Sequence, residues 1–228
     1  MVGIDLLQIH FWLGASLVAF ALCLSPNLVS ARTVAVKVTD QYGEPLPDAV
    51  ILVSGRASSV VEAEPAIMDQ INKQFQPRVL TIEKGRSVSF PNSDNIRHHV
   101  YSFSSPKVFE LKLYARQPEA PVIFDTPGIV VLGCNIHDSM VGYIVVTDSA
   151  NWGQTNAEGM ASLELSDSID ELRLWHPQQQ GDIAATTSVP YNPAFQGDTF
   201  AVQISVNPRV EAEPAAGFNN KRFQRYDR

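Results

Sequence analysis

Hydrophobic and polar residues alternate where the chain first shows a regular pattern, at residues 33–39, which read Thr-Val-Ala-Val-Lys-Val-Thr. A short apolar run, Ala-Val-Ile-Leu-Val, follows within residues 48–54. Alternation is typical of a strand with one buried face, and the Gly/Pro-rich segment between the two runs is typical of a turn. We therefore expect residues 33–39 and 48–54 to form a β-hairpin.

A longer series of strand patterns begins after residues 55–66, which are small and acidic and have the composition of a linker. Each pattern is a short apolar or alternating run, and Gly, Pro, Asn and Asp are frequent between the runs. The runs are residues 78–83, 86–90, 98–103, 109–114, 122–124, 128–132 and 143–147. No segment here has the length and period of a helix, so the series predicts an all-β sandwich.

Three more strand patterns follow Asp148, at residues 155–165, 171–175 and 199–206. Residues 208–228 carry few apolar side chains and end in a basic cluster, so we expect a disordered tail.

The outer segments carry a second motif. Val36-Lys-Val-Thr-Asp40 with the loop after it, and Thr155-Asn-Ala-Glu-Gly159 followed by Leu163, resemble the carboxypeptidase-regulatory or transthyretin-like β-sandwich. The resemblance implies a split domain, residues 32–58 and 149–207, with a second β-sandwich domain, residues 59–148, inserted into it. The alternative is that residues 33–55 add strands to one larger sandwich.

The first 31 residues have the pattern of a signal peptide. Residues 17–24 are continuously apolar, and Val29-Ser-Ala31 is a small-x-small cleavage pattern. Residues 1–10 contain Asp5 and no Lys or Arg, which departs from that pattern. The alternative is an uncleaved membrane anchor over residues 9–24, close to the shortest span that crosses a bilayer. We expect a periplasmic or otherwise exported protein.

Charge and cysteine content narrow the function classes. The formal net charge is −7, with no long basic stripe, which argues against a nucleic-acid partner and is compatible with a docking partner that has a basic face. Removal of the leader removes Cys23 and leaves Cys134 as the remaining cysteine. A single cysteine forms no internal disulfide, so in an oxidising compartment Cys134 is buried, reactive or a metal ligand.

Chemically active side chains cluster in Gly133-Cys-Asn-Ile-His-Asp-Ser-Met140, between two strand patterns. The C-x2-H-x2-M spacing supplies a thiolate, an imidazole and a thioether that can converge within one loop. This soft and intermediate donor set selects copper over magnesium or calcium, and Cys plus two His with a weak axial Met is the blue-copper arrangement. The second imidazole has to come from elsewhere in the chain, and the candidates outside the leader are His98, His99 and His176.

A paired histidine motif, His98-His-Val-Tyr-Ser-Phe103, starts a strand pattern after a polar loop. Together with the 133–140 loop it resembles the cupredoxin family, which includes plastocyanin, azurin and amicyanin. The resemblance covers about residues 66–148. It implies one copper ion held by His98, Cys134, His137 and Met140. His98 and His99 point to opposite faces of an extended strand, and the H-x-V match favours His98.

Several neighbouring positions acquire expected roles from the same resemblance. An electron would leave through His137, past a rim formed by Ile136, Met140 and Val141. The residues expected to pack beneath the metal are Phe90, Val100, Phe103, Phe124 and Leu132. His176 is expected at the surface or in a turn, and Asp69 and Asp94 are expected as turn and cap residues.

The resemblance implies an exported type 1 copper protein that carries single electrons between redox partners. The two-part architecture also resembles proteins grouped under methylamine utilisation, which implies a dehydrogenase donor and a cytochrome acceptor. We expect no enzyme activity, because copper oxidases and nitrite reductases need further histidine clusters and only His99 and His176 remain. The alternative is copper storage, delivery or adhesion without electron transfer.

Overall fold

The computed structural model describes residues 31–54, 64–118 and 120–208, and every regular element in these ranges is a β-strand. This confirms the all-β fold class. The predicted leader lies outside the described residues except for Ala31, and the predicted tail lies outside them except for Pro208. No helix in the described part of the chain has the length and apolar character needed to span a bilayer.

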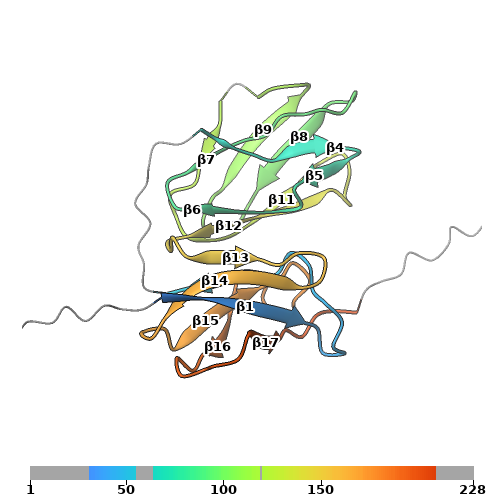
Figure 1. The fold of residues 1–228 in the computed structure, drawn as a ribbon. Helices are drawn as coiled ribbons and strands as arrows, with labels where there is room; N and C mark the ends of the chain where they lie inside the picture. The colour runs from blue at the N-terminus through green and yellow to red at the C-terminus, as the bar shows by residue number, and fades with distance from the viewer. Residues whose placement is uncertain (1–30, 55–63, 119, 209–228) are drawn as a thin grey trace, which may run out of the picture.

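Two facing sheets form the half of the molecule that carries both ends of the described chain (Figure 1). The first sheet has the order β14–β1–β17, formed by β1 (Ala31–Thr39), β14 (Met160–Ser166) and β17 (Thr199–Gln203). The second has the order β13–β2–β15–β16, formed by β2 (Val50–Val53), β13 (Trp152–Gln154), β15 (Glu171–Trp175) and β16 (Thr187–Pro190). One apolar cluster joins the two sheets, with Val36, Ile51 and Leu163 among its buried members. We call this half the outer sandwich.

The other half is built around a five-stranded sheet of order β6–β12–β11–β8–β9. Its strands are β6 (Val79–Glu83), β8 (His98–Ser102), β9 (Phe109–Tyr114), β11 (Gly128–Gly133) and β12 (Val141–Thr147). A second sheet has the order β10–β7–β3, from β3 (Ala66–Ile67), β7 (Ser87–Ser89) and β10 (Val122–Ile123), and β4 (Asp69–Ile71) pairs with β5 (Gln74–Gln76). We call this half the inner sandwich; its core includes Phe90, Phe124 and Leu132.

Strand pairing separates the two halves along the chain. Within the described residues, β3 to β12 pair with one another in sheets, and so do β1, β2 and β13 to β17. Part of the segment that connects β2 to β3 lies outside the described residues, so the boundaries 32–58, 59–148 and 149–207 stay a prediction. The likeness of the outer sandwich to a transthyretin-like domain also stays a prediction.

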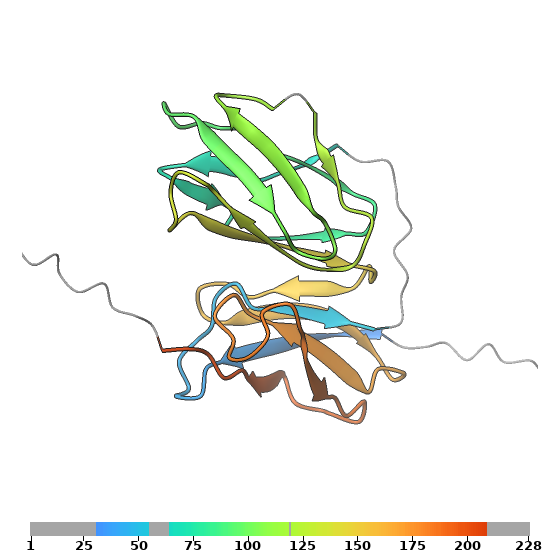
Figure 2. The same cartoon turned by 180° about the vertical axis from the view of Figure 1, so that it is seen from behind.

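A third apolar cluster lies between the halves, where β13 runs between them in both views (Figures 1 and 2). Val50, Leu52 and Trp175 come from the outer sandwich, and Tyr143 and Val145 are among the residues that meet them from the inner sandwich. The rings of Trp175 and Tyr143 lie 5.3 Å apart. Strands buried on both faces are expected to be apolar throughout, as β2 and most of β12 are.

The predicted hairpin of residues 33–39 and 48–54 is wrong. β1 pairs with β14 and β17, whereas β2 pairs with β13 and β15, so the two strands belong to facing sheets. The loop between them crosses from one sheet to the other, held by Asp40, whose Oδ1 accepts the N–H groups of Tyr42 and Glu44. Both edges of β2 are occupied, one by β13 and the other by β15, so no edge is left for β1.

One predicted core residue is also misplaced: Phe103 is 81% exposed. Along β8, His98, Val100 and Ser102 are buried while His99 and Tyr101 point outward, so the period of two puts Phe103 on the outer face. There its ring packs against Tyr101, with centroids 5.2 Å apart. The other four predicted residues, Phe90, Val100, Phe124 and Leu132, are fully buried in the core of the inner sandwich.

Candidate metal centre

Cys134 lies at the end of β11, at the start of the loop that leads to β12. Its side chain is 3% exposed and belongs to the apolar core of the inner sandwich. The residue before it, Gly133, faces Tyr101 on the neighbouring strand, and a Cβ on Gly133 would lie 2.7 Å from Tyr101 Cζ. The loop closes with a hydrogen bond from the Met140 N–H to the His137 carbonyl oxygen at 2.9 Å.

The upstream histidine enters the site from β8. His98 is fully buried, and its Nδ1 lies 3.7 Å from the Sγ of Cys134. His99 points to the other face of the strand, where its Nε2 lies 2.9 Å from Glu110 Oε1. Of the two candidate histidines, the structure therefore brings His98 to the cysteine.

His98, Cys134 and His137 form a group whose ligand atoms all lie within 4.8 Å of one another. The Nδ1 of His137 lies 4.0 Å from the Cys134 Sγ, and the two imidazole rings have centroids 5.1 Å apart. Metal–nitrogen and metal–sulfur bonds of about 2.0 and 2.3 Å at a trigonal angle separate the donor atoms by about 3.7 Å. The three residues are thus close enough to hold one metal ion, and a thiolate with two imidazoles fits copper.

Met140, the fourth predicted ligand, is 1% exposed and lies in the same apolar cluster as Cys134. That burial contradicts its expected place at the rim of the site, because a residue closed off by the core offers no surface to a partner. Its role as an axial ligand stays a prediction. Ile136, 48% exposed, and the half-buried His137 and Val141 do reach the surface.

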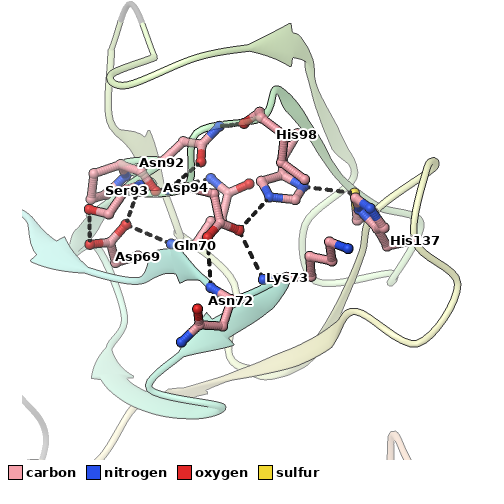
Figure 3. A network of polar contacts seen from close by, with 12 residues as sticks. Asp69, Gln70, Asn72, Lys73, Asn92, Ser93, Asp94, His98 and His137 are labelled. Carbon is pink, nitrogen blue, oxygen red and sulfur yellow. Dashed lines mark hydrogen bonds and ion pairs between the residues drawn. The ribbon is translucent and has the colours of Figure 1, made fainter.

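A carboxylate stands on the far side of His98 from the cysteine (Figure 3). Asp94 Oδ2 lies 2.8 Å from His98 Nε2 and also accepts the Lys73 N–H, while Oδ1 accepts the Asn72 N–H. Desolvation works to raise the pKa of Asp94, but the hydrogen bonds from Lys73, His98 and Asn72 outweigh it and lower that pKa. The sequence predicts Asp94 only as a turn or cap residue, because a spacing of four residues in an irregular loop does not indicate a contact with His98.

Buried polar side chains fasten the loop that carries Asp94. Asn92 donates from Nδ2 to the carbonyl oxygens of Ile96 and Tyr114, at 2.8 and 3.1 Å. The hydroxyl of Tyr114 donates to the Phe90 carbonyl oxygen, and Gln70 donates to that hydroxyl. Burial is the main cause that raises the pKa of Tyr114 to about 12, so this hydroxyl stays protonated and keeps donating. The network holds the loop that leads into β8, whose first residue is His98.

Two other polar residues singled out in the sequence lie outside the metal-ligand group. Asp69 is the first residue of β4 rather than a turn residue, so that expectation is wrong; its carboxylate accepts hydrogen bonds from Ser93 and from the N–H of Gln70. The sequence predicts His176 at the surface or in a turn. It lies in the turn after β15, and it is buried. It lies in the outer sandwich, where its Nε2 contacts the carbonyl oxygen of Pro47 at 3.1 Å.

Comparisons with solved structures return copper proteins. A copper-containing nitrite reductase from Thermus scotoductus SA-01 is 25% identical with a TM-score of 0.36, over 42% of this chain and 25% of that chain. A reduced Cu(I) form of an amicyanin mutant is 16% identical with a TM-score of 0.34, over 42% and 98%. A purple cupredoxin from Nitrosopumilus maritimus is 22% identical with a TM-score of 0.31, over 36% and 99%.

These likenesses cover less than half of the chain, and the matched part spans about a quarter of the nitrite reductase. No protein-family model matches the chain. No curated protein sequence matches it either. The function is therefore argued from the site itself.

Proposed function

We propose that this protein is an exported, mononuclear type 1 copper protein that carries single electrons and catalyses no reaction of its own. The observation that carries the proposal is the convergence of one thiol and two imidazoles, from β8 and from the loop before β12, within 4.8 Å. A bound copper ion would supply the chemistry by alternating between Cu(I) and Cu(II). His98, Cys134 and His137 would hold it, with Met140 as the weak axial ligand.

The surroundings of the three residues support rapid electron transfer. Cys134 and His98 are buried, and the core beneath them is apolar, so water is kept away and the side chains have little room to rearrange. His137 is half-buried beside the exposed Ile136, which leaves one imidazole edge near the surface. That edge is the proposed exit toward a redox partner.

The first test is the absorption spectrum of the copper-loaded protein. We expect one copper per chain and an intense thiolate-to-Cu(II) band in the visible region, because a type 1 site has that band. Cys134→Ala should abolish the band, and His98→Gln should weaken or abolish it. His99→Gln is the matched control, since His99 lies on the opposite face of β8, and it should leave the band in place. An unchanged band in Cys134→Ala sinks the proposal.

Storage or delivery of copper is the competing function, and exchange kinetics separate it from electron transfer. A delivery site releases its ion readily to a competing chelator, whereas a buried site retains it and is reduced and reoxidised reversibly. Stopped-flow reduction and chelator competition on the same sample measure both properties. Fast copper loss together with slow reduction would favour delivery.

A further inference from the structure

The imidazole of His98 lies between two groups of opposite chemistry. Its Nδ1 faces the Cys134 Sγ at 3.7 Å, and its Nε2 faces Asp94 Oδ2 at 2.8 Å. Both ends of the ring are therefore occupied, one by the candidate metal position and one by a carboxylate (Figure 3). Because His98 is fully buried, water does not compete for either nitrogen.

The carboxylate is itself held by the turn between β4 and β5. Asn72 and Lys73 have φ values of 55° and 59°, so two successive residues are left-handed, as in the turns that close tight hairpins. Their N–H groups donate to Asp94, from Asn72 to Oδ1 at 2.7 Å and from Lys73 to Oδ2 at 2.9 Å. From its own side, Asp94 donates its N–H to Asn92 Oδ1. Asp94 is thus fixed by contacts on two sides.

Proton positions follow from this arrangement. An ionised carboxylate only accepts hydrogen bonds, so the His98 Nε2 at 2.8 Å has to be the donor. A neutral imidazole with its proton on Nε2 carries its lone pair on Nδ1, the nitrogen that faces Cys134.

We propose that Asp94, clamped by the Asn72–Lys73 turn, is a positioning residue that holds His98 as the Nε2–H tautomer, so that Nδ1 is ready to bind before any metal arrives. The tautomer is a property of the metal-free protein, while the consequence for copper rests on the proposed function. A carboxylate behind a ligand histidine increases the electron density on the imidazole and strengthens metal binding. It also favours Cu(II), the more positively charged state, over Cu(I).

The tautomer is measured directly on the metal-free protein. Long-range ¹H–¹⁵N NMR distinguishes protonated from unprotonated ring nitrogens, and the His98 signals are assigned by their loss in His98→Gln. We expect His98 with a protonated Nε2 and an unprotonated Nδ1. A protonated Nδ1 in the wild-type protein would overturn the proposal, and this readout needs neither copper nor a variant at Asp94.

The role of the carboxylate is measured with a pair of charge-matched variants. Asp94→Asn removes the charge behind His98, and its amide also leaves one of the three donors without an acceptor. Asp69→Asn removes the same charge from the first residue of β4, whose carboxylate contacts Ser93 and not His98. We expect Asp94→Asn to weaken Cu(II) affinity roughly tenfold to a hundredfold, and to raise the reduction potential, while Asp69→Asn changes neither.

Equal affinities and potentials in the two variants would overturn the positioning role. Thermal unfolding of both variants shows that they are folded, and if Asp94→Asn fails to fold, the wild-type NMR result decides. If the wild-type protein binds no copper, the proposed function fails, but the tautomer of His98 is still measured and still supports or overturns the role of Asp94.

Discussion

At the scale of single residues, His176 is a buried titratable group that lies outside the metal-ligand group. Its Nδ1 accepts the Gln178 N–H at 3.2 Å, so the proton of the neutral ring is on Nε2, which donates to the Pro47 carbonyl oxygen. The side chain thereby joins the turn after β15 to the loop between β1 and β2. Burial lowers the pKa of His176, against a smaller opposing effect of the Pro47 hydrogen bond.

This lowered pKa predicts how stability depends on pH. The unfolded chain binds a proton at this histidine near pH 6.5, whereas the folded chain does so only at lower pH. The contribution of the neutral His176 to the free energy of unfolding is therefore fully present above about pH 6.5 and is lost as the pH falls below that value. Urea unfolding followed by tryptophan fluorescence should show a loss of stability between about pH 7.5 and pH 5 that is smaller in His176→Gln.

The control for this measurement is His99→Gln, which removes a partly buried histidine on the outer face of β8. It should keep the part of the pH dependence that belongs to His176. Identical slopes for wild type and His176→Gln would contradict the assignment.

At the scale of elements, the pairing of β8 with β11 positions the cysteine. Gly133 and Tyr101 are directly opposite each other, and the tyrosine ring occupies the space where a side chain on residue 133 would lie. Cys134 directly follows this close approach, so a change at residue 133 acts on the start of the loop. A glycine is required here for space rather than for backbone freedom.

Gly133→Ala tests this packing. The new methyl group overlaps the Tyr101 ring, and overpacking of this kind costs about 1–3 kcal/mol. We expect a lower free energy of unfolding and a weaker thiolate-to-copper band, because Cys134 is displaced with its neighbour. Combining Gly133→Ala with Tyr101→Ala should recover part of both losses, and a strictly additive double variant would show that the ring is not the cause.

The same scale shows what the sequence can predict. Alternation along β1 and β8 is legible, because one face of each strand is buried, and the C-x2-H-x2-M spacing predicts the loop because its ligands are local. The strands that pair with β2 cannot be predicted from the sequence, because a strand that is apolar on both faces gives no pattern that distinguishes one neighbour from another. The strands β4 and β5 were missed because Asp69–Ile71 and Gln74–Gln76 are short and polar. The contact of Asp94 with His98 was missed with them, since the turn that orients the carboxylate belongs to that hairpin.

At the scale of the whole molecule, the two sandwiches share the apolar cluster around Trp175. This side chain is completely buried, and its Nε1 donates to the Ile183 carbonyl oxygen at 2.8 Å. Its ring meets Tyr143 on β12, the strand that follows the ligand loop. The stability of the inner sandwich therefore depends in part on a residue of the outer one.

Trp175→Ala should lower the free energy of unfolding by about 3–5 kcal/mol, as large-to-small changes of buried aromatic residues do. Because the cavity opens against β12, the copper-site absorption should also disappear at a lower denaturant concentration. Tyr191→Ala is the control: Tyr191 is buried in the outer sandwich against Phe195 and Phe200, away from the shared cluster. It should destabilise the outer sandwich and leave the copper-site midpoint nearly unchanged. Equal midpoints in the two variants would refute the coupling.

The position of β12 has a consequence for how changes spread through the molecule. Its first residue, Val141, directly follows Met140. Its later residues pack on one face against the core of the inner sandwich and on the other face against the cluster shared with the outer sandwich. Val50 and Leu52 of β2 pack in the same cluster as Tyr143 and Val145, so substitutions in β2 act on the strand that begins where the loop of Cys134 and His137 ends. Residues remote from Cys134 and His137 thus help to determine how rigidly these two side chains are held.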